Sequence, residues 1–142
     1  MAGKQPKRKD RPGVDRYGRT PLHQAAADGD VLLSDELLKN GANPNAQDDN
    51  GWTPLHFAAQ AVCAPVAELL IKSGAKTELR DSFGNSPLWR AVFSSREDGS
   101  VIILLLAAGA DPLAKNTSDV SPVALARLIA NYDVRRFFDD LP

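Results

Sequence analysis

Apolar side chains recur at helical spacing in two kinds of segment, one short and one longer, which alternate along the chain. Leu22, Ala25 and Ala26 lie close to one stripe of a short helix, and the polar residues 28–30 end that helix after about two turns. A longer helix is predicted over 31–40. Its apolar side consists of Leu32, Leu33, Leu37 and Leu38. The alanines of the short helix favour close contact between helices.

A four-residue motif marks the start of each short helix. It begins with Thr or Ser, whose hydroxyl suits an N-cap, followed by Pro, which suits the first helical position. The copies are Thr20-Pro21-Leu22-His23, Thr53-Pro54-Leu55-His56, Ser86-Pro87-Leu88-Trp89 and Ser121-Pro122-Val123-Ala124. A Gly-Ala pair recurs in step at 41–42, 74–75 and 109–110. Two markers that share a period of 33 to 35 residues indicate a repeat protein.

Each unit therefore consists of a turn, a short helix, a longer helix and a loop. A single helix pair cannot bury its apolar side, so the copies must stack into one continuous core, and an all-α solenoid is predicted. Its four units span about 15–47, 48–80, 81–115 and 116–142. Gly18 supplies the positive φ of the first turn, whereas Asp119 takes that place in unit four and predicts an irregular hairpin. Unit four is expected to form helices at about 122–130 and 132–140 and to close the stack.

The repeated unit resembles the ankyrin repeat. Unit one carries Asp15-x-x-Gly18-x-Thr20-Pro21-Leu22-His23-x-Ala25-Ala26, then Gly29, Leu37-Leu38 and Gly41-Ala42-x-x-Asn45-Ala46. Unit two matches equally well, unit three is weaker, and unit four is degenerate, so that the resemblance covers about 90% of the chain. It implies an ankyrin-repeat solenoid, which is specific as a fold and weak as a guide to function.

Departures from the repeat predict local irregularities. Val62 replaces the glycine that unit one has at Gly29, and Pro65 is expected at the first position of the following helix. Unit three has two extra residues within 94–100, which predict a charged loop that bulges from the surface, either as a contact site or as tolerated drift. In unit one, the polar residues 34–36 suit an end repeat, which presents a polar face to water.

The composition is that of an ordinary globular protein, with 43% hydrophobic and 25% charged residues. The net charge of −1 hides a basic start, because residues 1–12 carry +4 and the remainder −5. Residues 1–14 have too few apolar side chains to fold, so a disordered basic tail is expected, with nucleic-acid or partner docking as the alternative. One cysteine, no secretory signal and no apolar run long enough for a bilayer favour a cytoplasmic protein.

The sequence offers little support for catalysis. The resemblance implies a structural role for His23 and His56, with hydrogen bonds to the backbone near the turn. Cys63 has no nearby histidine to activate it, and the carboxylate pairs at 48–49 and 139–140 are interpreted as solvated. The chain has no His/Cys cluster for a metal and no glycine-rich phosphate loop. We therefore expect no enzyme activity, no cofactor and no metal.

The resemblance implies that partners bind at the turn tips and along the inner face of the first helices. The candidate partner-binding residues are Arg16, Tyr17, Arg19, Asp28, Asp49, Asn50, Trp52, Gln60, Ser82, Phe83, Asn85, Phe93 and Arg96. Aromatic and arginine side chains are frequent affinity anchors. The alternative is that Trp52 and Phe83 pack against neighbouring turns and stiffen them. Aspartates near the tips, including Asp48 and Asp81, favour a partner with basic and apolar groups.

The function expected from this resemblance is protein–protein binding by a monomer, with no small-molecule substrate and no membrane partner. The short format and the closing segment resemble small bacterial ankyrin proteins, some of which are immunity proteins that cover the active site of a cognate toxin. The leading specific hypothesis is therefore an immunity protein whose partner is a toxin or effector. The alternatives are a scaffold or regulator without inhibitory action, and nucleic-acid association through the basic tail.

Overall fold

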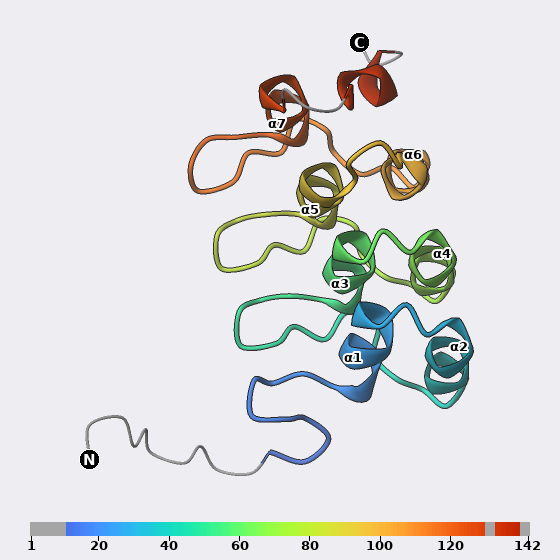
Figure 1. Ribbon diagram of the computed structural model, residues 1–142. Coiled ribbons are helices and arrows are strands. Elements are labelled where there is room, and N and C mark those ends of the chain that lie inside the picture. The colour runs from blue at the N-terminus through green and yellow to red at the C-terminus, as the bar shows by residue number, and fades with distance from the viewer. Residues whose placement is uncertain (1–10, 130–132, 140–142) are drawn as a thin grey trace, which may run out of the picture.

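The chain folds into stacked helix pairs, and the computed structural model describes residues 11–129 and 133–139. The helices are α1 (Pro21–Ala27), α2 (Val31–Lys39), α3 (Pro54–Gln60), α4 (Ala64–Lys72), α5 (Pro87–Ser94), α6 (Ser100–Ala107), α7 (Pro122–Leu128) and the 3₁₀-helix η1 (Arg135–Phe138). Figure 1 shows α1, α3, α5 and α7 in an inner column and α2, α4 and α6 in an outer column. The loops that precede the inner helices project away from the outer column. The predicted all-α solenoid is confirmed.

Each inner helix begins at the cap that the sequence motif predicts. Thr20 accepts a hydrogen bond from the amide of His23, and Thr53 accepts one from His56. Ser86 and Ser121 do the same in the later units, and a proline follows each cap. The hydroxyl satisfies one of the orphan amides of the first turn, and proline has no amide to leave unpaired there.

The core is made where helices of neighbouring units meet. Leu22, Leu55 and Leu88 hold the same place in successive units and are at most 1% exposed. Ala26 and Ala59 are completely buried, and consecutive helices contact one another within each column. Small side chains on the inner helices thus permit the close stacking that the alanine-rich pattern predicts, and each unit depends on its neighbours for its buried surface.

Glycine in the inner-column loops meets two separate demands. Gly51 has φ +79°, which side chains rarely adopt, and a Cβ there would lie 2.9 Å from the Cα of Asp81 in the next unit. Gly84 has φ +77°, and its Cβ would lie 2.9 Å from the amide nitrogen of Thr117. The left-handed backbone and the approaching loop therefore each exclude a side chain.

The loop of unit four is regular, so the predicted irregular hairpin is wrong. Asp119 has φ +66°, and its amide donates to the carbonyl of Asn116 over 3.0 Å, as the amide of Gly51 does to Asp48 over 2.9 Å. Within the part of the chain that the structure describes, no later loop packs against Asp119. Only the positive φ has to be met there, and aspartate tolerates that conformation better than most residues.

These two demands can be separated by substitution. Gly51→Ala should lower the free energy of unfolding by about 2–4 kcal/mol, from backbone strain and from the collision with the next loop. Asp119→Ala should lower the free energy of unfolding by less than about 1 kcal/mol, because it adds backbone strain but no collision with a following loop. Urea unfolding of both variants checks this, and equal losses would contradict the role of the neighbouring loop.

The turn between the helices of a unit also uses the left-handed conformation. Gly29 has φ +66°, and the residues in its place, Val62 and Arg96, both have φ +51°. Val62 thus keeps the turn at the cost of strain, which is largest for a β-branched residue. Pro65 is the second residue of α4 rather than the first, because α4 begins at Ala64.

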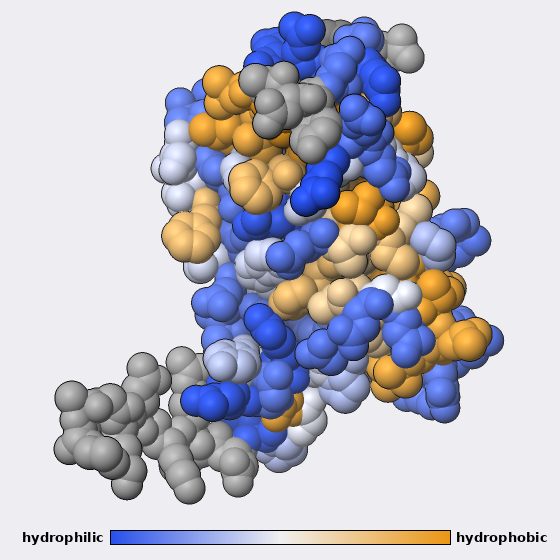
Figure 2. Space-filling model, viewed as in Figure 1, coloured by the Kyte–Doolittle hydropathy of each residue, from blue (hydrophilic) through white to orange (hydrophobic). Residues whose placement is uncertain are grey.

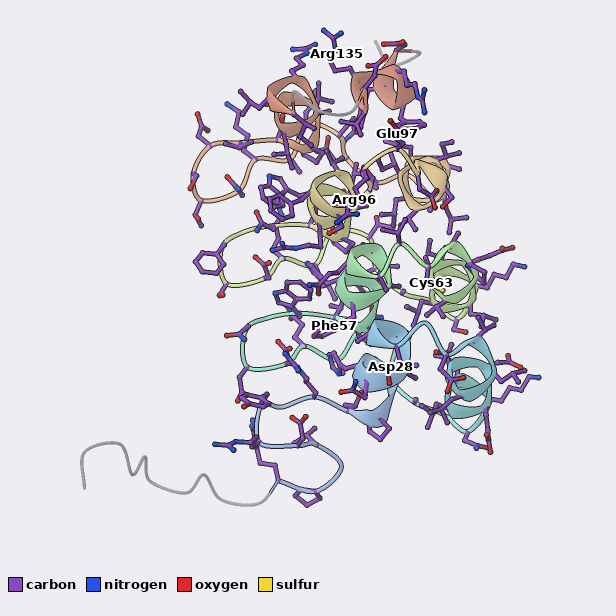
Figure 3. All side chains as sticks on the ribbon, viewed as in Figure 1. Asp28, Phe57, Cys63, Arg96, Glu97 and Arg135 are labelled. Atoms are coloured by element: carbon purple, nitrogen blue, oxygen red, sulfur yellow. The ribbon has the colours of Figure 1, made fainter. Side chains whose placement is uncertain are left out.

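The longer loop of unit three is exposed at its centre and buried at its ends. Arg96 and Glu97, labelled in Figure 3, lie in its exposed part, and Ser95 is only 3% exposed. A Cβ at Gly99 would lie 2.2 Å from the ring of Phe137. The C-terminal segment therefore packs against the base of this loop, while its charged centre faces solvent as predicted.

The two ends of the stack differ from the sequence expectations. Leu32 is 84% exposed and Leu33 is 40% exposed, whereas Ser34 is completely buried. The expected polar face of α2 is therefore only partly present, because Glu36 is exposed and Ser34 is not, and Figure 2 shows apolar surface over that helix. At the other end α7 stops at Leu128, and the helix expected over 132–140 is replaced by the short η1. Residues 130–132 and 140–142 lie outside the described residues.

The first hairpin begins earlier than expected. Arg11 lies within the segment 1–14 that we assigned to a disordered tail, yet its guanidinium donates hydrogen bonds of 2.8 and 3.0 Å to the carboxylate of Asp49. The amide of Val14 donates to the carbonyl of Arg11 over 3.3 Å. Residues 11–14 are thus held against the second loop, and the rest of the predicted tail, 1–10, lies outside the described residues.

Candidate protein-binding surface

The loops 15–19, 48–52, 81–85 and 116–120, together with the inner helices α1, α3, α5 and α7, form what we call the inner surface. One backbone hydrogen bond joins each pair of neighbouring loops. The amide of Asp49 donates to Tyr17 and that of Ser82 donates to Asn50, each over 2.9 Å. The amide of Thr117 donates to the carbonyl of Phe83 over 2.9 Å. The loop tips are therefore tied into a continuous edge.

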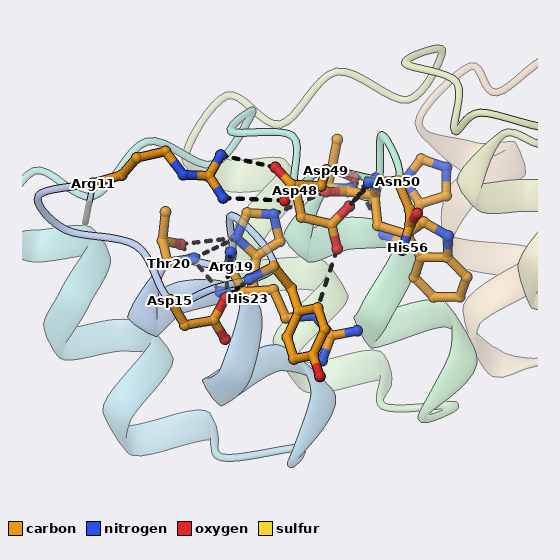
Figure 4. A network of polar contacts seen from close by, with 12 residues as sticks. Arg11, Asp15, Arg19, Thr20, His23, Asp48, Asp49, Asn50 and His56 are labelled. Carbon is orange, nitrogen blue, oxygen red and sulfur yellow. Dashed lines mark hydrogen bonds and ion pairs between the residues drawn. The ribbon is translucent and has the colours of Figure 1, made fainter. Parts of the chain in front are cut away.

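A histidine links each of the first two units to the next. The Nδ1 atom of His23 accepts from the amide of Thr20 over 2.9 Å, so its Nε2 carries the proton and donates to the carbonyl of Trp52 over 2.8 Å. His56 pairs in the same way with Thr53, over 3.1 Å, and with the carbonyl of Asn85, over 2.8 Å. Figure 4 shows the contacts of His23 beside those of the first two loops. The histidines are structural, as the resemblance implies, and their second bond crosses to the following unit.

Burial lowers the pKa of both His23 and His56 below the ordinary value of 6.5. Loss of hydration is the largest cause, and the hydrogen bonds to Trp52 and Asn85 oppose it only in part. The folded protein therefore holds both rings neutral at a pH where the unfolded chain has begun to protonate them. A charged ring would put a proton on Nδ1 and break the bond from the cap amide.

The histidine links predict a pH dependence of stability. Below pH about 6.5 the unfolded chain binds more protons than the folded one, so the free energy of unfolding should fall by up to about 1.4 kcal/mol per histidine for each pH unit. Urea unfolding between pH about 7.5 and 5.5 measures this, above the range of most carboxylates. The double variant His23→Gln with His56→Gln should be less stable at pH 7.5 and nearly pH-independent. A wild-type stability that stays constant over this range would disprove the link.

We call the contact between units one and two the first junction, and the later contacts the second and third junctions. An arginine packs on an aromatic ring at each of the first two junctions. At the first junction Arg19 comes from the loop, its guanidinium lies 5.0 Å from the ring centroid of Phe57, and its Nε lies 3.6 Å from Asp48. At the second junction the roles are exchanged. Arg90 comes from α5, lies 4.7 Å from the ring of Trp52 in the loop, and approaches Asp81 to 3.9 Å.

The repeat explains this exchange, because Arg19 and Trp52 are equivalent positions 33 residues apart, and so are Phe57 and Arg90. Phe57, labelled in Figure 3, lies on the loop side of α3. Each junction thus combines one guanidinium with one aromatic face and one buried carboxylate. Cation–π contacts of this kind contribute about 0.5–2 kcal/mol, more when they are desolvated.

The third junction lacks both the histidine link and the contact of an arginine with an aromatic ring and an aspartate. Asn116 replaces the aspartate, and its amide nitrogen donates to the side-chain oxygen of Asn85 over 2.9 Å. Trp89 stands where the first two units have a histidine, and its indole Nε1 is buried with no hydrogen-bond partner within the described residues. A neutral amide pair therefore takes the place of the carboxylate and the arginine, and the side-chain bond to the next backbone is missing.

The structure brings most of the predicted partner-binding residues to the inner surface. Tyr17, Phe83 and Phe93 are 50%, 67% and 59% exposed. The other exposed members are Arg16, Asn50, Asp49, Gln60 and Ser82, and Arg19 is partly exposed. Asp28 and Arg96 are exposed as well, but they lie outside the inner surface, after the ends of α1 and α5. Half or more of each of these three rings is therefore open to solvent.

Two predicted residues belong to the junctions instead. Asn85 is 5% exposed and is held by Asn116 and Asp81, so it does not reach a partner. Trp52 is half-buried, with its ring centroid 4.8 Å from that of Phe57 and Arg90 on it. The packing alternative is correct for Trp52 and wrong for Phe83, which is mostly exposed.

The sequence reading missed the arginine–aromatic pairs, and it overestimated the acidity of the inner surface. Asp48 and Asp81 are 7% and 6% exposed and bind the amides of their own loops, while Asp49 is paired with Arg11. Asp48 and Asp81 are therefore not available to a basic partner, whereas Asp28 is exposed, and Asp15 and Asp119 add exposed carboxylates in the loops. Arg90 was detectable in principle, because it repeats the position of Phe57 with the complementary chemistry.

Stability measurements can separate the two kinds of aromatic residue. Trp52→Ala should lower the free energy of unfolding by about 2–4 kcal/mol, because it removes a partly buried ring at a junction. Phe83→Ala should change the free energy of unfolding by less than about 0.5 kcal/mol, as expected for an exposed side chain. Thermal and urea unfolding give both values. A large loss of stability for Phe83→Ala would mean that its side chain contributes to the folded stack, as that of Trp52 does.

A family model described as ankyrin repeats in three copies matches residues 22–116, which is more than half of the chain. The chain belongs to the ankyrin-repeat family. The match stops where unit four begins, and the structure adds that unit with its regular loop and α7. A comparison with curated proteins finds no match. Ankyrin repeats are protein-interaction modules, and this chain is such an ankyrin-repeat protein.

Among the described residues, no three or more His, Cys, Asp or Glu side chains gather as they would to hold a metal ion. Within the same residues, each helix is too short or too polar to cross a membrane.

Proposed function

We propose that this protein is a non-catalytic binding module that captures a partner protein on its inner surface. The observation that carries the proposal is the exposure of three aromatic residues, Tyr17 in unit one and Phe83 and Phe93 in unit three, on loops and a helix that are joined to their neighbours. Aromatic and arginine side chains provide most of the binding energy at protein interfaces. Loop tips joined by backbone hydrogen bonds lose little conformational entropy when a partner docks.

Two of the exposed aromatic residues, Phe93 and Tyr17, pack against neighbouring side chains. The ring of Phe93 is stacked on that of Trp89, with centroids 5.6 Å apart and planes 12° from parallel. The ring of Tyr17 lies under the guanidinium groups of Arg16 and Arg19, at 5.4 and 5.2 Å. Both rings are thus held by neighbouring side chains while half or more of each stays exposed, which is the arrangement expected of an anchor residue.

Site-specific photo-crosslinking tests this proposal in cells that express the chain. A photoreactive phenylalanine analogue at Phe83 or Phe93 should crosslink to one and the same protein. Ile103 on the outer helix α6 is 56% exposed and serves as the matched apolar control, where that product should be absent. Equal crosslinking from all three positions, or none from Phe83 and Phe93, would contradict binding at the inner surface.

The finer hypothesis is that binding inhibits a toxin or effector by covering its active site in the cytoplasm. Its support is the resemblance to small bacterial ankyrin proteins and a rigid surface suited to docking. Co-expression with genes encoded beside this one tests it. Rescue of growth that is lost in the double variant Phe83→Ala with Phe93→Ala would support inhibition. A crosslinked partner whose activity is unchanged by saturating amounts of this protein would instead make it a scaffold.

A further inference from the structure

We propose that units three and four of the inner surface bind the apolar face of a partner helix, with Phe93 and Leu128 as the two contacts along the stack. This inference rests on the proposed function and names the units that engage the partner and the kind of segment that they take. It is based on the exposure of Leu128, on the place that Phe93 and Leu128 share in the repeat, and on the paired charges beside them.

Leu128 extends the exposed apolar surface of unit three into unit four. It is 71% exposed, more than either Phe83 or Phe93. Leu128 is the seventh residue of α7, as Phe93 is the seventh residue of α5, and these two helices contact one another in the inner column. We call Phe83, Phe93 and Leu128 the apolar patch. Figure 2 shows apolar surface at the end of the stack that holds α7.

The equivalent positions of the first two units are not large and apolar. The seventh residues of α1 and α3 are Ala27, which is small and half-buried, and Gln60, which is polar and exposed. One turn earlier on the same side of the helix, the first two units have their buried histidines, whereas units three and four have Trp89 and Ala124, both half-buried. The apolar patch therefore belongs to units three and four alone.

The charged groups beside the apolar patch occur in pairs of opposite sign. Arg90 lies 3.9 Å from Asp81, and Lys115 lies 3.4 Å from Asp119 in the loop of unit four. Arg127 precedes Leu128 in the sequence, but it lines a cavity of about 390 Å³ on the side of α7 that faces η1. Because the neighbouring charges are balanced, the patch suits uncharged apolar side chains better than a charged segment.

The repeat sets the spacing that a partner must match. Packed helices are about 8–10 Å apart, which gives a similar distance between Phe93 and Leu128. On a helix, residues seven positions apart lie on one face and about 10 Å from one another, because each residue rises 1.5 Å. On one face of an extended strand the side chains are about 7 or 13 Å apart. A helix laid along the stack therefore matches the pair better than a strand does.

The size of the apolar patch fits a single helical segment. Its three side chains expose about 400 Å² together. A standard interface buries about 800 Å² on each partner, and roughly 57% of that area is apolar. The patch thus supplies most of the apolar area that one such interface needs.

A display selection on the full-length protein tests the inference with defined probes. Yeast displaying random 20-residue segments are selected for binding, and the enriched segments are synthesised and measured on variants. We expect apolar residues seven positions apart on an otherwise weakly charged face. Phe93→Ala and Leu128→Ala should each weaken binding about fivefold or more. Ile103→Ala, on an exposed apolar residue of the outer helix α6, is the matched control and should change binding less than about twofold.

Two further measurements address the helix and the charge. Proline placed midway between the two apolar residues of a selected segment should weaken binding about tenfold or more, because proline breaks a helix, whereas alanine at that position should have little effect. Raising the salt concentration from about 50 to 500 mM should change the Kd less than about twofold, because balanced charges contribute little to binding.

The outcomes distinguish this inference from the proposed function. Enriched segments that are strongly charged, that tolerate the proline or that ignore Leu128→Ala overturn the inference. If such segments still lose binding with Phe83→Ala or Phe93→Ala, the proposed function stands. If no enriched segment depends on Phe83 or Phe93, the proposed function fails as well.

Other occupants of the apolar patch have their own signatures. Phosphatidylcholine vesicles that displace the selected segments would indicate a lipid surface. A concentration-dependent dimer that Leu128→Ala abolishes, detected by analytical ultracentrifugation, would indicate a second copy of this chain. Either result overturns the inference. Thermal unfolding checks that each variant is folded, and Leu128→Gln repeats the test if Leu128→Ala is not.

Discussion

The hydrogen bond from a repeat histidine to the backbone carbonyl of the next unit is the contact on which the regular part of this stack depends. His23 and His56 each connect the cap of one inner helix with the last loop residue of the following unit. A buried neutral imidazole is the group that can accept from one backbone amide and donate to a distant carbonyl at once. Each such bond contributes about 1 kcal/mol, and its loss would leave the carbonyl of the next unit unsatisfied.

At the third junction, where no histidine links the two units, the other side-chain contacts differ as well. Trp89 cannot accept from a cap amide, because its indole nitrogen is a donor only, and that donor is unpaired. At the same junction Asn116 replaces the aspartate, and Leu125 holds the place that Arg90 has in the unit before. The carboxylate therefore occurs at the two junctions where Arg19 or Arg90 approaches it, and a neutral amide occurs at the third, where the guanidinium of Arg80 bonds backbone carbonyls instead. This pattern is consistent with a cost for burying an unbalanced charge.

Most of the fold was predictable from the sequence, because period and caps are local signals. The repeat period and the four N-caps follow from short motifs whose physics does not depend on distant residues, and the family resemblance implied the structural role of the histidines. The burial of Asn85 and Trp52 was not predictable in this way, because it depends on which side chain the next unit presents. Leu32 shows the same limit, since an apolar helix position is buried only if a neighbouring unit covers it. Asp119 keeps a regular loop because no later loop crowds it in the described residues.

The candidate surface consists of aromatic residues that the junctions between units do not bury. Trp52 and Phe57 hold the junctions, whereas Tyr17, Phe83 and Phe93 lie outside them and remain exposed. Arg19 and Arg90 belong mainly to the junctions, because they pack on the rings of Phe57 and Trp52 and are only partly exposed. The equivalence of positions 33 residues apart relates these residues to one another, and side-chain contacts decide which role each one has.

Native-state hydrogen exchange of the free protein tests the central claim that side-chain links between units set stability along the stack. Helices α1 and α7 are the first and last helices of the inner column in the described chain. Only the unit of α1 has a histidine bond to the neighbouring unit. Amides of α7 should exchange through an opening that costs about 1–3 kcal/mol less than the opening of α1. Protection of α7 equal to or greater than that of α1 would contradict the claim.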